Sequence, residues 1–374
     1  MHPPNAVTAS TAMLDLPIIR YRFDCVARTP IRLPDYAGSL LRGAFGRALR
    51  QVACITREKD CAPCALKRGC PYTAVFAPGK PETPHPRLQN SEIPAPYVIE
   101  PPGWGARIVA PGESFVFHMV LIGRAVEHLP IVILAWRRAL ARGLGPGDGT
   151  GDIAAVVTET GQVIHTPTQG SIAVHESAVA CPRSGIPGTQ SAPARCLLCT
   201  TFGSPAGTFA EPPATVTLRF STPLRLQQNG NALPPHRLTP RPLILAAARR
   251  ASLLAEFHGT DGTPPALDWK ALAAEADALD DQRRLEWRDW TRYSSRQQRP
   301  MTLGGVVGDW TLKGSIGHAW PWLYLGQWLH LGKETVFGLG GYRLESGLPD
   351  HNSTPGGKDC GRPAQVTEGK ERKG

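Results

Sequence analysis

The chain has 374 residues, of which 41% are hydrophobic and 19% charged, which excludes a short peptide or a single small module and leaves room for two or three domains. No apolar run approaches the roughly 18 residues needed to cross a bilayer, so we expect a soluble protein with no membrane partner. Residues 1–15 lack a basic segment followed by an apolar core; we expect them to form a flexible N-terminus and the protein to be cytoplasmic.

The net charge is +10, and because only nine of the 41 basic residues are Lys, Arg supplies the other 32. Arg presents a planar fork that binds phosphates bidentately and stacks on bases. The composition therefore favours a polyanionic partner such as nucleic acid. The alternative explanation is a GC-rich genome, which also raises the content of Ala, Gly and Pro.

The first predicted elements are a strand and a helix. Tyr21, Phe23 and Cys25 alternate with polar residues, which is typical of a half-buried strand. Asp35 is expected to cap a helix that runs to about Val52, because apolar residues recur there at helical spacing.

Four cysteines follow this helix within 17 positions: Cys54, Cys61, Cys64 and Cys70. A reducing cytoplasm disfavours disulfides, and four thiolates are suited to one structural zinc ion or an iron-sulfur cluster. Zinc is favoured, and an iron-sulfur cluster is the alternative, because the spacing and the Pro that follows Cys70 also occur around clusters. The expected role is to hold together a loop, over 54–70, that has no core of its own.

A second, weaker cysteine group comprises Cys181, Cys196 and Cys199. It lies in a Gly/Pro-rich insertion over 166–213. Two interpretations are open: a second small metal-binding site, or thiols that share no metal ion.

The remaining elements suggest an internal duplication. Arg22-Phe23 and Thr29 to Leu33 reappear as Arg219-Phe220 and Thr222 to Leu226, each pair at the start of a strand followed by a helix. Further strands and helices are predicted in both halves, over 114–122, 126–141, 154–174, 287–294, 301–313 and 318–329.

Each half reads as strand, helix, strand, strand, helix, strand, so the predicted fold is α+β, with two tandem ferredoxin-like βαββαβ domains and a four-cysteine metal-binding insertion. The copies are expected to begin near Ile18 and Thr215. The predicted divisions are an N-terminal domain over 16–205 that carries the insertions, a C-terminal domain over 214–345 and a disordered basic tail over 346–374.

A Gly-rich segment over 332–341 lies between the last helix and the last strand. Its glycines allow close backbone approach, and Lys333 adds a point charge suited to phosphate. Alone it is a weak signal, since a tight turn explains it equally well.

In this context the Gly-rich segment resembles the signature of the repeat-associated RNA-binding (RAMP) superfamily. Specifically, the chain is similar to the cysteine-bearing bacterial members of the CRISPR precursor-RNA processing endoribonucleases, which serve antiviral defence. The segments that carry the resemblance are 292–297, 304–308 and 330–333, and the match is densest over 285–345. The first glycine of the family's loop is missing here, where His330-Leu331-Gly332 stands instead.

The resemblance implies cleavage of repeat RNA without metal, by attack of the ribose 2′-hydroxyl, to give 2′,3′-cyclic phosphate and 5′-hydroxyl ends. Such chemistry needs a base, an acid and cations that stabilise the phosphorane. The histidine usual near the first helix is absent, since none occurs between His2 and His85. The candidate catalytic residues are therefore His330, then His318, together with Tyr36 and Arg42.

Candidate RNA-binding residues fall in two groups. Arg292 and Arg296 lie in an Arg-rich strand, and Arg47 and Arg50 share a helix face with Arg42. The resemblance adds the loop residues Gly332, Lys333, Gly338 and Gly340.

Two alternatives remain. A non-catalytic subunit of the same fold would bind guide RNA in an effector ribonucleoprotein complex, and the missing histidine keeps this reading open. A zinc-containing DNA-binding protein fits less well, because no recognition-helix pattern accompanies the basic residues.

Overall fold

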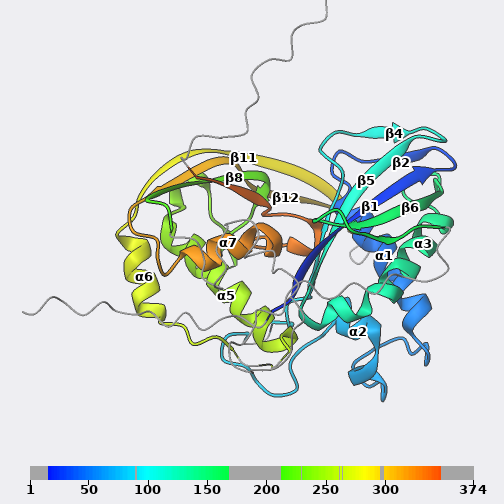
Figure 1. Cartoon of the computed structure of the whole chain (residues 1–374), viewed down its shortest axis with the longest axis horizontal. Helices are drawn as coiled ribbons and strands as arrows, with labels where there is room; N and C mark the ends of the chain where they lie inside the picture. Colours follow the sequence, from blue (N-terminus) through cyan, green and yellow to red (C-terminus); the bar gives the residue numbers. More distant parts are fainter. Residues whose placement is uncertain are drawn as a thin grey trace, which may run out of the picture.

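The computed structural model describes residues 16–88, 91–167, 212–228, 230–260, 262, 264–294 and 299–346. Two antiparallel sheets with their own helices lie side by side (Figure 1). Within these ranges no helix is long and apolar enough to cross a membrane. The predictions for Cys181, Cys196, Cys199, Arg296 and the two chain ends concern residues outside these ranges.

The first sheet belongs to the N-terminal domain. Its strand order is β3-β5-β1-β6-β7, and every neighbouring pair is antiparallel. The elements of this half are β1 (Ile18–Ala27), β2 (Ile31–Leu33), α1 (Gly38–Ala53), a 3₁₀ turn (Lys67–Gly69), α2 (Pro71–Val75), β3 (Tyr97–Glu100), β4 (Arg107–Val109), β5 (Ser114–Ile122), a second 3₁₀ turn (Gly123–His128), α3 (Leu129–Arg142), β6 (Gly151–Thr158) and β7 (Val163–His165).

The second sheet has the order β11-β12-β8-β13. Its half contains β8 (Thr215–Leu224), β9 (Gln227–Gln228), β10 (Asn231–Ala232), a 3₁₀ turn (Pro235–Arg237), α5 (Pro240–His258), α6 (Trp269–Asp277), β11 (Asp280–Ser294), β12 (Arg299–Lys313), α7 (Trp320–Leu329), a 3₁₀ turn (Thr335–Phe337) and β13 (Tyr342–Ser346).

The two sheets share one topology. In each, the first strand lies between the third and the fourth, and the second strand lies at the edge. This is the arrangement of the split βαβ unit, so the predicted pair of ferredoxin-like domains is confirmed. The first strands begin at the predicted Ile18 and Thr215, and β7 adds a fifth strand to the first sheet.

Two local predictions need correction. Asp35 does not cap the first helix: α1 begins at Gly38 after Ala37, with no side-chain cap, and the Asp35 carbonyl instead accepts a hydrogen bond from the Gly105 amide. The short strand β3 was not predicted, because only four residues between two proline-containing segments carry its signal.

The domains pack through the first sheet. One face of that sheet is covered by α1 and α3, with Phe23, Phe45 and Trp136 in the core. The opposite face contributes Ile18, Val98, Val120 and Ile122 to the same apolar cluster as α5 and α7. The second domain therefore packs against this face of the first sheet through these apolar residues.

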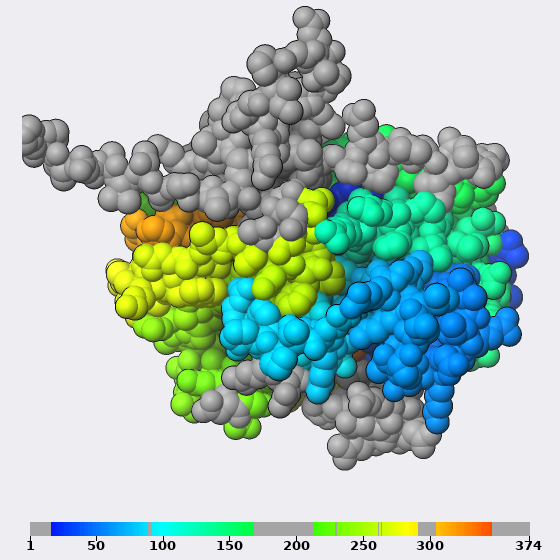
Figure 2. Space-filling model, turned by 90° about the horizontal axis from the view of Figure 1, so that it is seen from below, coloured from blue at the N-terminus to red at the C-terminus, as the bar shows by residue number. Residues whose placement is uncertain are grey.

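A loop of the first domain extends the contact. His85 and Arg87 both pair with Glu256 of α5, and Arg87 also donates to Ser252. In Figure 2 the light-blue segment that contains this loop lies against the yellow-green α5 region. This loop thus adds a further contact between the two domains to that made by the first sheet.

Candidate active site at the domain interface

The Gly-rich loop between α7 and β13 enters the first domain. The backbone has positive φ at His330, Gly332, Gly338 and Gly340. A Cβ on Gly338 would lie 2.6 Å from the Ile99 carbonyl oxygen, so the loop and β3 approach more closely than any side chain would allow. The close partner of Gly338 is therefore the first domain of the same chain, whereas Gly332 and Gly340 approach the backbone of Arg225 and Leu331 in their own domain.

Hydrogen bonds within the second domain fix the loop. The Thr222 hydroxyl donates to the Gly338 carbonyl at 2.7 Å and accepts from the Gly341 amide at 2.8 Å. The Gly340 amide donates to the Pro223 carbonyl. These loop amides are used to hold the loop itself, which leaves them unavailable for a phosphate.

Tyr36 lies where the loop meets α1. Its hydroxyl donates to the Phe337 carbonyl at 2.7 Å, and its ring packs on Trp104 and Trp290. Burial raises the pKa of Tyr36 well above its ordinary value, and the nearby Glu100 carboxylate adds to the shift. The structure thus brings Tyr36 to the loop as a buried hydrogen-bond donor.

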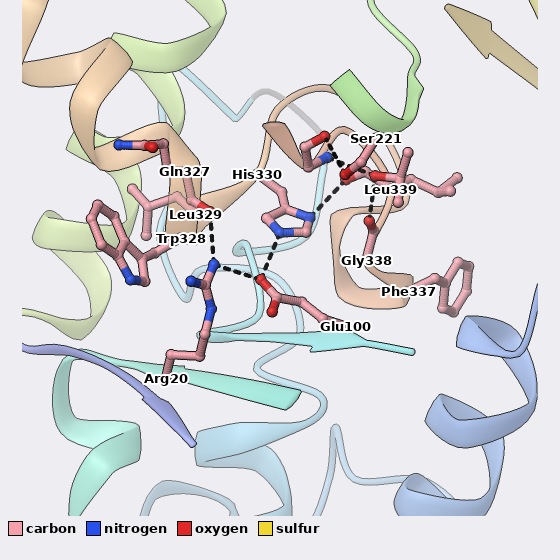
Figure 3. Close-up of polar contacts among 12 residues, drawn as sticks. Arg20, Glu100, Ser221, Gln327, Trp328, Leu329, His330, Phe337, Gly338 and Leu339 are labelled. Carbon is pink, nitrogen blue, oxygen red and sulfur yellow. Dashed lines mark hydrogen bonds and ion pairs between the residues drawn. The ribbon is translucent and has the colours of Figure 1, made fainter. Parts of the chain in front are cut away.

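His330 begins the loop and is 4% exposed. Its Nδ1 lies 3.2 Å from the Leu339 carbonyl oxygen, and its Nε2 lies 3.1 Å from Oε1 of Glu100 (Figure 3). Both ring nitrogens therefore have partners inside the protein. This geometry favours a positioning role for His330 over the proton transfer expected from the sequence.

Glu100 also binds Arg20, a buried residue of β1. Arg20 donates to Glu100 at 2.8 Å and to the Gln327 carbonyl of α7 at 3.1 Å (Figure 3), and it also donates to Glu159 at 2.8 Å. Burial alone would raise the pKa of Glu100, but hydrogen bonds and positive charge from His330 and Arg20 outweigh it and lower that pKa to about 2. Glu100 thus remains an anion that joins Arg20 of the first domain to His330 of the second.

A cavity of about 220 Å³ opens beside this network, between the two domains. Its walls include Arg20, Glu100, Trp104 and His118 from the first domain and Ser221, Gln327, His330 and Arg343 from the second. Neither domain alone forms it. It is the place where candidate residues of both halves meet.

The three arginines of α1 have separate environments. Arg42 lies over the rings of Phe76 and Phe337, and Arg50 donates to the carbonyls of Glu58 and Lys59 in the cysteine-containing segment. Arg47 is exposed. Only Arg47 is therefore free of such packing, and the three do not form one phosphate-binding row.

The remaining sequence candidates lie apart from the cavity. His318 is exposed before α7, where its backbone amide donates to Glu275, at the end of the helix opposite His330. Lys333 is exposed on the loop. Arg292 lies on β11 opposite Met301, and its side chain is not among those described.

The four cysteines of the predicted metal site line one cavity of about 300 Å³. Each is a free thiol, and Thr56 lies between Cys54 and Cys64, 4.0 and 3.5 Å from their sulfur atoms. Within the described ranges, no three His, Cys, Asp or Glu side chains are arranged to hold one metal ion.

Sequence reasoning missed His118, Glu100 and Arg343. A signal existed for the first two, since His118 interrupts the apolar run of β5 and Glu100 ends that of β3. A polar residue at an inward position of a strand indicates a buried partner or a site. Which groups it meets depends on the packing of two domains, which spacing does not give.

The fold and the cavity define a class of protein: a duplicated ferredoxin-like protein whose Gly-rich loop completes a polar site between its two copies. Residues 218–342 match the family model described as CRISPR-associated endoribonuclease Cas6, and residues 16–177 match a model described as an N-terminal domain. The domain over 218–342 belongs to the Cas6 family, which confirms the resemblance seen in the sequence.

Several solved structures are similar at low identity. A Cas6 product complex is 16% identical, with 87% of this chain and 99% of that chain covered and a TM-score of 0.48. Thermus thermophilus Cas6 is 13% identical, with 88% and 99% covered and a TM-score of 0.46. A RAMP protein binding different RNA substrates is 10% identical, with 88% and 100% covered and a TM-score of 0.43. No curated protein matches the chain.

Proposed function

We propose that this protein is an endoribonuclease that cleaves CRISPR repeat RNA without a metal ion and so produces mature guide RNA. The observation that carries the proposal is the Cas6-family domain over 218–342, whose Gly-rich loop builds the cavity between the domains. Repeat RNA is the proposed substrate, and a CRISPR ribonucleoprotein complex is the proposed partner that takes up the guide RNA.

The proposed reaction is an internal transesterification. The 2′-hydroxyl oxygen forms a bond to the adjacent phosphorus while its proton passes to a base. The bond from phosphorus to the 5′-oxygen breaks, and that oxygen takes a proton from an acid. The products are a 2′,3′-cyclic phosphate and a 5′-hydroxyl end.

The cavity offers the groups that this reaction needs. Guanidinium groups in and beside it counter the charge of the phosphorane. The Arg20, Glu100 and His330 network holds the walls in place. Preorganised charge of this kind accelerates the reaction because it need not reorganise.

A non-catalytic RNA-binding subunit is the competing proposal, and the burial of His330 between two partners favours it. A denaturing gel of repeat RNA incubated with the full chain in EDTA separates the two. We expect cleavage with a cyclic phosphate on the upstream product. Binding of repeat RNA without any cleavage, with or without divalent metal, would support the subunit instead.

For the cysteine-containing segment we propose a structural metal, zinc in preference to an iron-sulfur cluster. Support comes from four free thiols around one cavity, in a segment whose 3₁₀ turn has no buried residue. The sulfur atoms of the four cysteines would have to move closer together to bind one ion. No step of RNA cleavage involves this site.

A further inference from the structure

Two histidines line the interdomain cavity, His330 and His118. His330 is buried, and both of its ring nitrogens have protein partners. His118 is half-buried, and within the described part of the chain its ring makes no hydrogen bond. Of the two imidazoles, His118 is therefore the one that can meet a ligand in the cavity.

The β register directs His118 to the cavity. Its neighbours on β5, Phe117 and Met119, are buried against the helices of the first domain, so His118 points to the opposite face of the sheet. On that face it lies between Glu100 of β3 and Arg22 of β1, with which it is in direct register. The sheet thus fixes an imidazole in a row of charged side chains.

The charges around His118 favour its neutral form. Burial is the largest cause that lowers the pKa of His118; the Glu100 carboxylate opposes it, and the guanidinium groups of Arg20, Arg22 and Arg343 lower the pKa further. A neutral imidazole retains a lone pair that can accept a proton.

Arg343, at the start of β13, brings positive charge from the second domain. Its side chain is partly exposed, lines the same cavity and has no ion pair within the described ranges. Burial and the neighbouring Arg20 lower the pKa of Arg343, while Glu100 and Glu159 raise it. A guanidinium without an ion pair can bind a phosphate, and an imidazole without a hydrogen bond can accept a proton from the hydroxyl next to that phosphate.

We propose that His118 is the general base of RNA cleavage and that Arg343 binds the scissile phosphate. The proton of the 2′-hydroxyl passes to the free ring nitrogen of His118 as the O2′ to phosphorus bond forms, and the displaced 5′-oxygen leaves from the far side of the phosphorus. Arg343 hydrogen-bonds the non-bridging oxygens. This inference rests on the proposed function and assigns it a residue.

The test uses single-turnover cleavage of repeat RNA by the full chain at saturating protein. His118→Ala should slow cleavage by about 100-fold and leave RNA affinity unchanged, because proton transfer acts in the transition state. His118→Gln, which keeps a polar side chain on the strand, should be equally slow. The matched control is His236→Ala, an exposed histidine outside the cavity, which should cleave at the wild-type rate.

The pH profile identifies the proton transfer. The wild-type rate should rise with pH through the lowered pKa of His118 and then level off, since the deprotonated ring is the active form. His118→Ala should lose this rise, and imidazole added to the buffer should restore part of the rate. Absence of rescue together with an unchanged pH profile would overturn the assignment.

A substrate with sulfur in place of the 5′-bridging oxygen separates base from acid, because a thiolate leaves without protonation. The defect of His118→Ala should persist with this substrate; a defect that disappears would make His118 the acid and overturn the proposal. Wild-type activity in both His118 variants would overturn the inference alone. RNA binding without cleavage by the wild type would overturn the proposed function and the inference together.

Discussion

Glu100 is central to the domain interface, because it is a largely buried anion that binds one residue of each domain. It accepts hydrogen bonds from Arg20 at 2.8 Å and from His330 at 3.1 Å through the same oxygen. Removal of one member of a buried ion pair leaves the other charge without a partner. The carboxylate therefore stabilises contacts of both domains.

Glu100→Gln keeps the shape of the side chain and removes its charge. We expect a loss of about 3 kcal/mol in the free energy of unfolding, the size found when a buried ion pair loses one partner. Urea denaturation followed by tryptophan fluorescence measures it. The control is Glu286→Gln on the exposed face of β11, which should change stability by less than about 0.5 kcal/mol. Equal effects of the two variants would contradict the assigned role.

Acid should unfold the protein in part through the same residue. The folded pKa of Glu100 is about 2, below its ordinary 4.5, so its contribution to stability is complete above about pH 4.5 and is lost as the pH falls toward 2. Wild-type stability should thus fall more steeply over that range than the stability of Glu100→Gln. Parallel curves from urea titrations at several pH values would count against this.

At the scale of elements, the first helix and the Gly-rich loop fit together through two backbones. A Cβ on Gly38 of α1 would lie 2.0 Å from the Phe337 carbonyl oxygen, whereas one on Gly43 in the same helix would meet only the end of Arg47, at 3.6 Å. The close approach of the loop therefore requires a glycine at position 38, whereas position 43 has room for a side chain.

Gly38→Ala should destabilise the protein by about 2 kcal/mol, because the loop must move away from α1. Gly43→Ala should stabilise it by up to about 1 kcal/mol through helix propensity. Thermal unfolding of the two variants and the wild type measures whether each substitution lowers or raises the stability. A stabilising Gly38→Ala would show that the loop does not pack against α1.

The cysteine-containing segment gives a second prediction at this scale. Protein purified anaerobically without chelator should carry one metal site per chain, zinc by elemental analysis, and a brown protein absorbing near 400 nm would instead indicate iron-sulfur. A double variant, Cys61→Ser with Cys64→Ser, should lose the metal, and Cys360→Ser should keep it. The absence of both zinc and iron from the wild type would remove the proposal.

The strands that could be predicted from the sequence are those with a clear local pattern of apolar residues. Alternation in Tyr21, Phe23 and Cys25 was enough to predict β1, and the run over 114–122 was enough for β5. β3 was missed because it is short, and the contacts of Glu100 with Arg20 and His330 were missed because they join residues 80 and 230 positions apart. Such contacts depend on how the domains dock, and periodicity carries no information on that.

At the scale of the whole molecule, the sequence is rich in Arg, but many of the guanidinium groups already bind other groups of the protein. Arg20, Arg50 and Arg87 bind protein groups, and Arg219 pairs with Asp309 and Glu345. The net charge of +10 therefore overstates the surface available to RNA. The arginines without such partners should account for most of the salt-dependent affinity.

The double variant Arg292→Ala with Arg296→Ala tests the RNA contact predicted from the sequence. Affinity for repeat RNA should fall, and each lost phosphate contact should reduce the slope of log K against log salt by about 0.7 to 0.9. Filter binding at several salt concentrations measures both. Replacing Arg68, which pairs with Glu82 on the surface, gives the control. An unchanged slope would place the RNA elsewhere.

The position of the Gly-rich loop so late in the chain also governs when the cavity can exist. A ribosome releases the first domain before the second, so Arg20, Glu100 and His118 emerge early in translation. The Gln327 carbonyl, His330 and Arg343 follow only once most of the second domain has been synthesised. A nascent chain held beside its own messenger therefore has no finished cleft in which RNA could be cut, and the cleft closes only after its last strand has left the ribosome.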